Sequence, residues 1–334
     1  MTLTAATDPT LTVTPVIWLV FVGAVLVFLA LDLGVFHRKP RAVTFGEALM
    51  WTTIWFSMAM AFAFWLAPMM FGEQWQASHT KLFITGYVVE LSLSMDNVFV
   101  IALIFTYFRV PLEYQHRVLF WGILGALVMR GVMILSGAEL IERFDWILYV
   151  FGAFLLFTGI KMLFAADEEV EPEKNIVIRL ARKIYPVTTE YDGQHFFTPL
   201  NGRRALTPLA LCLIMVETTD LIFAVDSIPA IFGITTEAFI VFTSNVFAIL
   251  GLRSLYFVLV GLLRHFRYLK HGMAFVLVFI GFKMLVVLWE GHPAWLNFEG
   301  NHDAVLGIIG AILGLSIVAS VLAPGGTGTD AGKE

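Results

Sequence analysis

Charged residues are scarce in this sequence: they make up 14% of its 334 residues, while hydrophobic residues make up 59%. A soluble domain is about one quarter charged, so this composition excludes an ordinary soluble fold and indicates a membrane protein. Cysteine is scarcer still, because Cys212 is the only one. A chain with one thiol forms no internal disulfide and no cysteine cluster, which excludes a soft-metal site built on thiolates.

Signatures of several catalytic and binding classes are also missing. The sequence has no GxxxxGK[ST] segment, which excludes the common nucleotide-binding loop, and its histidines form no HxxxH pair. It contains no recognisable pairing of a nucleophile with a base. We therefore expect no enzymatic activity, no nucleic-acid partner and no permanently bound cofactor.

Long apolar runs recur along the whole chain and predict an all-α, polytopic bundle of about nine transmembrane helices. A run of about 20 residues crosses the roughly 30 Å hydrocarbon layer as a helix. The first run follows an N-terminus without Lys or Arg, so we expect a retained span rather than a cleaved signal peptide. The expected spans are residues 15–36, 46–71, 80–108, 117–138, 144–166, 206–232, 238–263, 271–289 and 303–323.

Basic residues gather in alternate loops between these spans, and the opposite loops hold only Lys81 and Arg143. The positive-inside rule then predicts that the N-terminus lies outside and the C-terminus in the cytoplasm. The basic residues of the predicted cytoplasmic side are Arg38, Lys39, Arg41, Arg109, Arg117, Lys174, Arg179, Arg182, Lys183, Arg203, Arg204, Arg264, Arg267, Lys270 and Lys333.

Spans three to five match spans six to eight, which indicates an internal repeat. Asp96 aligns with Asp220, Arg130 with Arg253, and a Gly-x-Lys-Met-Leu segment recurs, at offsets of 122 to 124 residues. Because each unit has three spans, the second must be inverted, and inverted repeats place their ligand site near the bilayer midplane. The expected division is 1–78 (two N-terminal helices), 79–166 (first three-helix unit), 167–205 (cytoplasmic loop), 206–290 (second, inverted unit) and 291–334 (last helix and short tail).

Five carboxylates interrupt two of the apolar runs, and each would cost roughly 2.5 to 3.5 kcal/mol at the centre of a bilayer. Arg130 and Arg253 are candidates for balancing part of this charge. The remaining negative charge and the oxygen donors suit a hard divalent cation such as Mn²⁺, Mg²⁺ or Ca²⁺, together with a proton. The five acids are Glu90, Asp96, Glu217, Asp220 and Asp226.

Helical spacing limits how these acids meet. At about 100° per residue, Glu90, Ser94 and Asn97 share one face, whereas Asp96 lies roughly 120° from Glu90. Asp226 points away from Glu217 on its own helix. Three arrangements stay open at this point: the helices unwind locally, the acids form two stations, or some acids pair structurally with the two arginines.

The remaining features favour ordinary structural roles. The loop 167–205 is expected to be a solvated linker with a short amphipathic helix and a hairpin at Asp192-Gly193, and metal sensing or partner docking is the minority interpretation. Lys161 and Lys283 lie nearer span ends and are expected to snorkel to the interface. The small residues Gly310 and Gly314 are expected to pack the last span against a neighbouring helix.

Three segments carry a closer resemblance. They read Glu90-xxx-Ser94-x-Asp96-Asn97-Val-Phe, Phe223-Ala-Val-Asp226-Ser-Ile-Pro-Ala-Ile-Phe and Thr243-Ser-Asn245-xx-Ala-Ile-Leu-Gly-Leu-Arg253. They closely resemble the TerC family of integral membrane proteins, including its Alx-like branch, and the resemblance extends over all nine spans. That family belongs to a wider group of LysE-like exporters, which agrees with the inverted three-helix units.

The resemblance implies export of manganese across a bacterial cytoplasmic (inner) membrane by alternating access, with protons as a candidate coupling ion. It implies that Mn²⁺ is the transported substrate rather than a resident cofactor. The family's link to tellurium resistance need not describe the cargo, because a negative interior repels an oxyanion. The implied metal ligands are Glu90, Asp96, Glu217, Asp220 and Asp226, with Ser94, Asn97 and Asn245 as neutral ligands.

Two other functions remain alternatives on this reasoning. The buried acids could be structural in a non-transporting membrane scaffold or assembly factor, or the cargo could be Ca²⁺ or another hard cation. The expected partners are the metal ion, the lipid bilayer and protons as a candidate coupling ion. The sequence does not indicate an oligomeric state.

Overall fold

The computed structural model describes residues 11–31, 44–144, 146–164, 175–200, 202–260, 268–286, 298 and 301–322. Within these ranges the chain is almost entirely helical, and its one sheet is a two-stranded hairpin. The described helices include 8 that are long and apolar enough to cross a membrane, and the apolar α1 (Pro15–Leu31) is shorter. The prediction of an all-α polytopic membrane protein is confirmed.

The long helices lie close to the predicted spans. The second predicted span contains a π-helical turn just before Pro68. Proline is a common cause of such a local irregularity in a helix. The segments that could cross a membrane are α2 (Phe45–Ala61) with η2 (Phe62–Leu66), α3 (Ala67–Phe71) and η3 (Gly72–Gln74), then α4 (Ala77–Phe108), α5 (Leu112–Arg143), α6 (Ile147–Phe164), α8 (Pro208–Phe232), α9 (Ala238–Val260), α10 (Leu269–Val286) and α11 (His302–Leu322).

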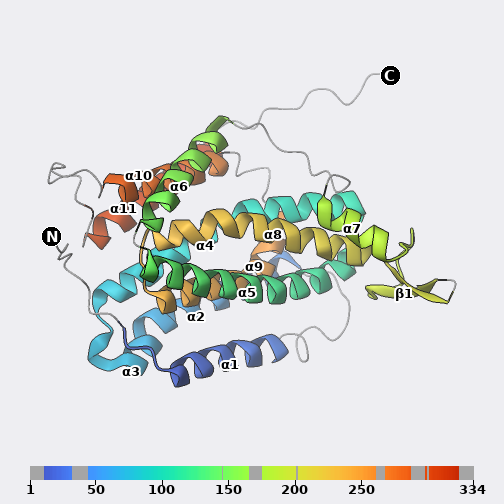
Figure 1. Ribbon diagram of the computed structural model, residues 1–334, viewed down its shortest axis with the longest axis horizontal. Helices are drawn as coiled ribbons and strands as arrows, with labels where there is room; N and C mark the ends of the chain where they lie inside the picture. The colour runs from blue at the N-terminus through green and yellow to red at the C-terminus, as the bar shows by residue number, and fades with distance from the viewer. Residues whose placement is uncertain are drawn as a thin grey trace.

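Helix α9 lies at the centre of the molecule and is buried along nearly its whole length. It packs against α2, α4 and α5, and α8 packs against α4 and α5 (Figure 1). A helix that is apolar on every side is expected to be surrounded by other helices. Helices α4, α5, α8 and α9 therefore form the central layer of the bundle.

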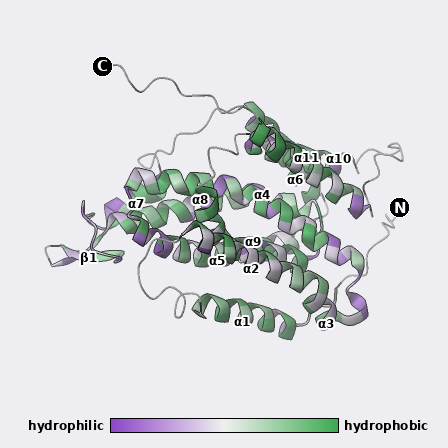
Figure 2. Cartoon of the chain, turned by 180° about the vertical axis from the view of Figure 1, so that it is seen from behind, coloured by the Kyte–Doolittle hydropathy of each residue, from purple (hydrophilic) through white to green (hydrophobic). Residues whose placement is uncertain are grey.

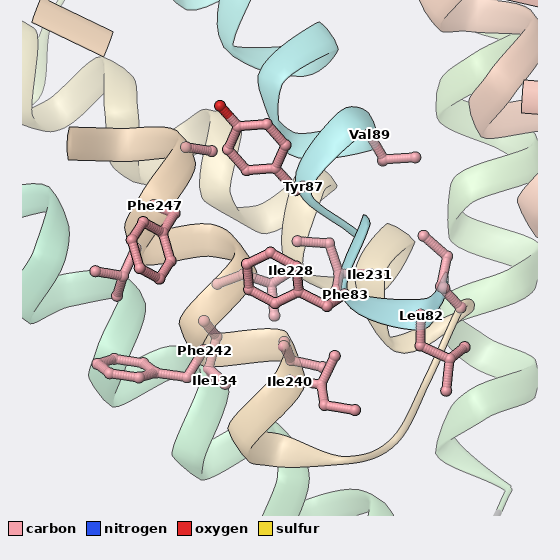
Figure 3. Close-up of a cluster of buried hydrophobic side chains, with 14 of the residues drawn as sticks. Leu82, Phe83, Tyr87, Val89, Ile134, Ile228, Ile231, Ile240, Phe242 and Phe247 are labelled. Atoms are coloured by element: carbon pink, nitrogen blue, oxygen red, sulfur yellow. The ribbon is translucent and has the colours of Figure 1, made fainter. Parts of the chain in front are cut away.

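Close aromatic and aliphatic packing fixes this central layer. Phe83 stacks on Tyr87 along α4, and Phe247 of α9 meets Phe83 edge-on. Figure 3 shows side chains from four helices converging on this cluster. The labelled members are Leu82, Phe83, Tyr87 and Val89 of α4, Ile134 of α5, Ile228 and Ile231 of α8, and Ile240, Phe242 and Phe247 of α9.

Helices α6 and α10 form a second, closely packed pair beside the central layer. A Cβ atom at Gly159 would lie 2.9 Å from the carbonyl oxygen of Ala274, and one at Gly281 would lie 2.7 Å from the carbonyl oxygen of Gly152. Small residues of this kind let the backbones of membrane helices approach closely. The two glycines align in the internal repeat, and both lie at the same helix contact.

The helix contacts follow the pattern expected of two related three-helix units. If α4, α5 and α6 correspond to α8, α9 and α10, then the α4–α9 contact corresponds to α5–α8, and the α6–α8 contact to α4–α10. All four contacts are present among the described residues. This pattern agrees with an internal repeat, and the inversion of the second unit and the proposed division of the chain remain predictions.

The segment between α6 and α8 contains the predicted amphipathic helix, α7 (Ile176–Ile184), followed by strands β1 (Phe197–Leu200) and β2 (Arg203–Leu206). The expected hairpin position is wrong, because β1 pairs with β2 from Phe197 opposite Leu206 to Leu200 opposite Arg203, and Gly202 between them has a positive φ of 78°. Asp192-Gly193 forms a separate turn, in which the backbone N–H of His195 donates to the carbonyl oxygen of Asp192. The acidic residues 167–173 lie outside the described residues.

Hydropathy differs sharply between the bundle and this hairpin. Figure 2 shows hydrophobic residues along the long helices and hydrophilic residues near β1 and α7.

The predicted packing of Gly310 and Gly314 in the last helix is a second correction. Among the described residues no atom lies within 4 Å of a Cβ built at either glycine. These glycines therefore do not pack against another described helix of the same chain.

Candidate ion-binding site

Arg130 lies near the middle of α5 and is the largest side chain that the fold buries completely, with an exposed fraction of 1%. Its guanidinium forms an ion pair with the carboxylate of Glu90 from α4. It also forms an ion pair with Asp220 from α8 and donates a hydrogen bond to Ser227, at 3.1 and 3.3 Å. A buried charge is tolerated only when it is paired in this way.

Glu90 is fully buried, with an exposed fraction of 0%. Its Oε1 atom accepts from Arg130 and lies 3.5 Å from the Ser94 hydroxyl. Its Oε2 atom has no hydrogen-bond partner among the described residues. One oxygen of this carboxylate is therefore satisfied, while the other retains unused acceptor capacity in the interior of the bundle.

Asp220 receives two nitrogen atoms of Arg130. The Nε atom lies 3.3 Å from Oδ2, and an Nη atom lies 3.1 Å from Oδ1. This fork-to-fork geometry fixes the orientation of both groups. The amide of Asn97 on α4 lies 3.5 Å from Oδ1, so Asp220 connects α8 to both α4 and α5.

Glu217 lies one helical turn before Asp220 on α8, close enough for their carboxylates to repel. Its carboxylate lies against the backbone of Gly125 in α5, where an added Cβ would overlap the carboxylate oxygens. Among the described residues no ion pair or side-chain hydrogen bond satisfies Glu217. The missing side chain at Gly125 provides the space that this acid occupies.

Asp226 belongs to a different cluster. It interacts electrostatically with Lys161 and lies near the hydroxyl of Thr158, both on α6. The expectation that Asp226 points away from Glu217 therefore agrees with the structure. Lys283, the repeat counterpart of Lys161, donates to the carbonyl oxygen of Gly233 at 3.0 Å, so both lysines have protein partners and snorkelling alone does not describe them.

Asn245 lies on the central helix α9 with an exposed fraction of 1%. Neither its amide nitrogen nor its amide oxygen has a hydrogen-bond partner within the described part of the chain. The adjacent hydroxyl of Ser244 donates to the carbonyl of Val241 at 3.2 Å. An unsatisfied buried amide costs roughly 1 to 3 kcal/mol, so this position calls for an explanation.

Asp96 and Arg253 complete the predicted set. Both side chains are half-buried, on α4 and α9 respectively. Arg253 lines a cavity of about 20 Å³ together with Asp220 and Val216. This volume is large enough for about one water molecule. Asp220 thus lies between Arg130, which it binds directly, and a small cavity that Arg253 also lines.

Two of the five acids share one arginine partner in the structure. Glu90 and Asp220 meet at Arg130, with Ser94 and Asn97 beside them, so structural pairing with an arginine is present for these two acids, while Asp226 lies apart from them beside α6. Among the described residues no group of three or more His, Cys, Asp or Glu side chains is arranged to hold a metal ion. Metal binding by these residues remains a prediction.

Sequence reasoning missed Gly125, Thr158 and Ser227. Ser227 follows Asp220 by seven residues, which places it on the same helical face, so the 3.6-residue period could have identified it. Gly125 and Thr158 matter because of which helices they oppose. That information comes from tertiary packing, and no local pattern contains it.

The comparisons with known proteins agree with this architecture. Residues 74–325 match the family model described as "Integral membrane protein TerC family". An "Uncharacterized membrane protein STKORF319" of Myxococcus xanthus is 48% identical over 310 residues, covering 92% of each chain. A "Putative membrane-bound redox modulator Alx" of Escherichia coli K12 is also 48% identical, over 92% of this chain and 94% of its own.

A more distant relative covers a similar extent. An "Uncharacterized membrane protein" of Rickettsia bellii is 37% identical over 302 residues, which is 90% of this chain and 98% of its own. No solved structure matches the chain.

Proposed function

The chain belongs to the TerC family of integral membrane proteins, and we propose that it is a secondary transporter that exports a divalent cation, foremost Mn²⁺, from the cytoplasm. The observation that carries the proposal is the set of acids around Arg130 in the central layer. Glu90, Asp220 and Glu217 come from two helices that belong to different repeat units. Such an interface is where inverted-repeat transporters bind their substrates.

The charge of this cluster supports a divalent cargo. Three ionised carboxylates and one guanidinium leave a net charge of about two negatives, which one divalent cation or two protons would neutralise. The donors are oxygen atoms, which hard ions such as Mn²⁺ prefer to sulfur. A monovalent cation would leave the cluster charged, and an anion would be repelled.

Arg130 has a specific part in this proposal. It supplies the positive charge between Glu90 and Asp220, so a metal ion that used both carboxylates would have to displace the guanidinium. Glu217 needs no such displacement, because no described side chain neutralises it. In the proposed mechanism Glu217 attracts the cation first. The cation then displaces the Arg130 guanidinium from between the carboxylates while the site changes the side of the membrane to which it is open. Protons entering on the same carboxylates would then restore the charge.

The rival interpretations lead to different experimental results. In a membrane scaffold the acids would serve only to hold helices together, and Glu217 would have no role because it holds nothing. The name "redox modulator" describes the relatives, and this chain's one cysteine, Cys212, is buried and allows no thiol–disulfide pair within the chain. A Ca²⁺ exporter would use the same chemistry and is separated by the choice of ion.

The test is cellular manganese content in manganese-stressed cells, measured by elemental analysis at matched membrane abundance. The variant is Glu217→Gln, which removes a charge without leaving Arg130 unpaired. We expect the native protein to lower cellular Mn and this variant to lose most of that effect. The matched control is Glu139→Gln, because Glu139 is an exposed acid on α5 that pairs with Arg143 one turn away.

Each outcome favours one interpretation. Equal Mn content with native protein and Glu217→Gln would contradict transport through this cluster. An unchanged Mn content with a Glu217-dependent fall in Ca would keep the mechanism and change the cargo. Loss of folded protein in Glu217→Gln would show that this acid holds the fold, which would contradict its proposed role as the residue that attracts the cation.

A further inference from the structure

Helix α7 presents three separate faces, which distinguishes it from an ordinary solvated linker helix. The first faces the protein: Ile178 is fully buried in a cluster with Leu206 at the end of β2 and Leu209 at the start of α8. The side chain of Asn175, which caps α7, lies 3.4 Å from the sulfur of Met215 on α8. The helix is therefore held against the end of the bundle (Figure 1).

The second face is apolar and uncovered. Ile176, Leu180 and Ile184 follow each other at intervals of four residues and form one stripe along the helix. Their exposed fractions are 73%, 56% and 64%. A stripe of three large aliphatic side chains is unfavourable in water, and Ile178, which holds the helix to the protein, lies on another face.

The third face is basic. Arg179, Arg182 and Lys183 lie at spacings of three and four residues, and all three side chains are exposed. None of them forms an ion pair within the part of the chain that the structure describes. An apolar stripe beside a basic stripe on a short helix is typical of a segment that lies in the membrane interface.

We propose that α7 lies in the interface of the predicted cytoplasmic leaflet, with Ile176, Leu180 and Ile184 among the acyl chains and its three basic residues on anionic phospholipid headgroups. The location supports this occupant, because α7 packs beside the first turns of α8, a helix long and apolar enough to cross the membrane. The charge also fits, since the anionic leaflet attracts juxtamembrane basic residues. The proposal does not depend on transport.

The test places a fluorophore on the apolar stripe of the full-length protein. Bimane is attached at Leu180→Cys in a Cys212→Ala background, and the protein is reconstituted in phosphatidylcholine vesicles with or without phosphatidylglycerol. We expect strong quenching by brominated acyl chains and weak quenching by aqueous iodide. A label at Phe197→Cys, an exposed position on β1, is the control and is expected to show the reverse.

The headgroup preference is tested with charge variants. Brominated phosphatidylglycerol is expected to quench the Leu180 site more than brominated phosphatidylcholine at the same fraction. Each of Arg179→Gln, Arg182→Gln and Lys183→Gln should lower that preference by up to about fivefold. The control variant, Arg203→Gln with Arg204→Gln, removes two exposed charges from β2 and should leave the preference unchanged.

Three results would overturn the proposal. Iodide quenching at Leu180 without lipid quenching would place the stripe in water. Equal quenching by both brominated lipids would remove the role of the basic face. Shielding that appears only at high protein-to-lipid ratio would show that a second copy of the chain covers the stripe.

Discussion

Arg130 and Arg253 occupy matching positions in the two repeat units, yet the fold treats them differently. Arg130 is buried and bound by Glu90, Asp220 and Ser227. Arg253 is half-buried and lines two cavities of about 20 Å³ each, one with Asp220 and one with tryptophans of α2. The same residue at equivalent places is thus fully buried in the first unit and half-buried beside small cavities in the second.

A second pair of matching positions shows the same asymmetry. Gly125 of α5 aligns with Ala248 of α9 at the offset that relates the two arginines. Gly125 leaves room for the carboxylate of Glu217, whereas Ala248 is packed in the apolar core. The two units therefore differ in how deeply the matching arginine is buried and in the room left at this small-residue position. The predictions below test how far that difference extends.

The largest expected effect concerns the buried arginine. In Arg130→Gln the carboxylates of Glu90 and Asp220 lose their positive partner, and breaking a buried pair costs about 3 to 5 kcal/mol. We expect a clear fall in thermal stability, measured in detergent by fluorescence-detected size-exclusion chromatography. The same change at its counterpart, Arg253→Gln, should cost less, because that side chain is only half-buried. Equal losses at both positions would show that the two units are energetically equivalent.

A rescue variant separates charge from packing in this result. Combining Arg130→Met with Glu90→Gln and Asp220→Asn removes the ion pairs as a whole, which is often nearly neutral for stability. We expect the triple variant to recover much of the stability that Arg130→Gln loses, while manganese export stays absent. If the triple variant is less stable than Arg130→Gln, unpaired charge is not the cause.

The next largest effect is expected from a substitution that gives the first unit the residue found at the matching position of the second. Gly125→Ala adds a Cβ that would overlap the carboxylate of Glu217, as at the matching Ala248. We expect overpacking to cost about 1 to 3 kcal/mol, measured as a lower unfolding temperature, together with reduced manganese export. The control is Gly122→Ala, whose new Cβ would lie 3.3 Å from a methyl group of Val216.

A second background isolates the cause of this effect. When Glu217→Ala is already present, Gly125→Ala should be close to neutral, because the overlapping carboxylate is gone. A penalty that persists in that background would place the strain elsewhere on α5.

Helix positions and helix faces were predictable from this sequence, because the apolar runs and the 3.6-residue period act locally. The shared face of Glu90, Ser94 and Asn97 and the opposite direction of Asp226 both followed from that period. The partner of each acid was not predictable, because pairing depends on which helices touch. Arg130 reaches Asp220 through the α5–α8 contact, ninety residues along the chain.

The hairpin failed for a different reason. The sequence contains both Asp192-Gly193 and Asn201-Gly202, and the prediction considers only the first of these dipeptides. What decides between them is the flanking chain, since β1 and β2 pair from Phe197 with Leu206 to Leu200 with Arg203. Turn chemistry has to be judged together with the strands it connects.

A smaller effect is expected at the contact between Asp226 and helix α6. Asp226→Asn weakens the interaction with Lys161 and Thr158, and a half-buried contact of this kind is worth about 1 kcal/mol. Because Asp226 is turned toward α6 and away from Arg130, we expect manganese export to fall less than in Glu217→Gln. Elemental analysis at matched abundance measures both variants. A complete loss in Asp226→Asn would extend the transport site to α6.

The smallest expected effect concerns the segment that joins the two units. The hydroxyl of Tyr191 donates to the carbonyl oxygen of Phe108 at 2.7 Å and ties this segment to the end of α4. Burial raises the pKa of Tyr191 from 10.0 to about 12. Tyr191→Phe should lower stability by about 1 kcal/mol, the usual net value of one hydrogen bond.

The pH dependence gives this prediction its sign. A tyrosine whose pKa is raised on folding contributes its full stabilisation below the unfolded pKa of 10.0 and loses it as the pH rises through about 12. The difference in unfolding temperature between native protein and Tyr191→Phe should therefore be constant below pH 10.0 and shrink above it. Tyr185→Phe, at an exposed tyrosine whose ring packs on Phe197, is the control and should show no such change. A difference that grows above pH 10.0 would mean that Tyr191 ionises in the folded protein more easily than in the unfolded chain, and that burial does not hold its proton.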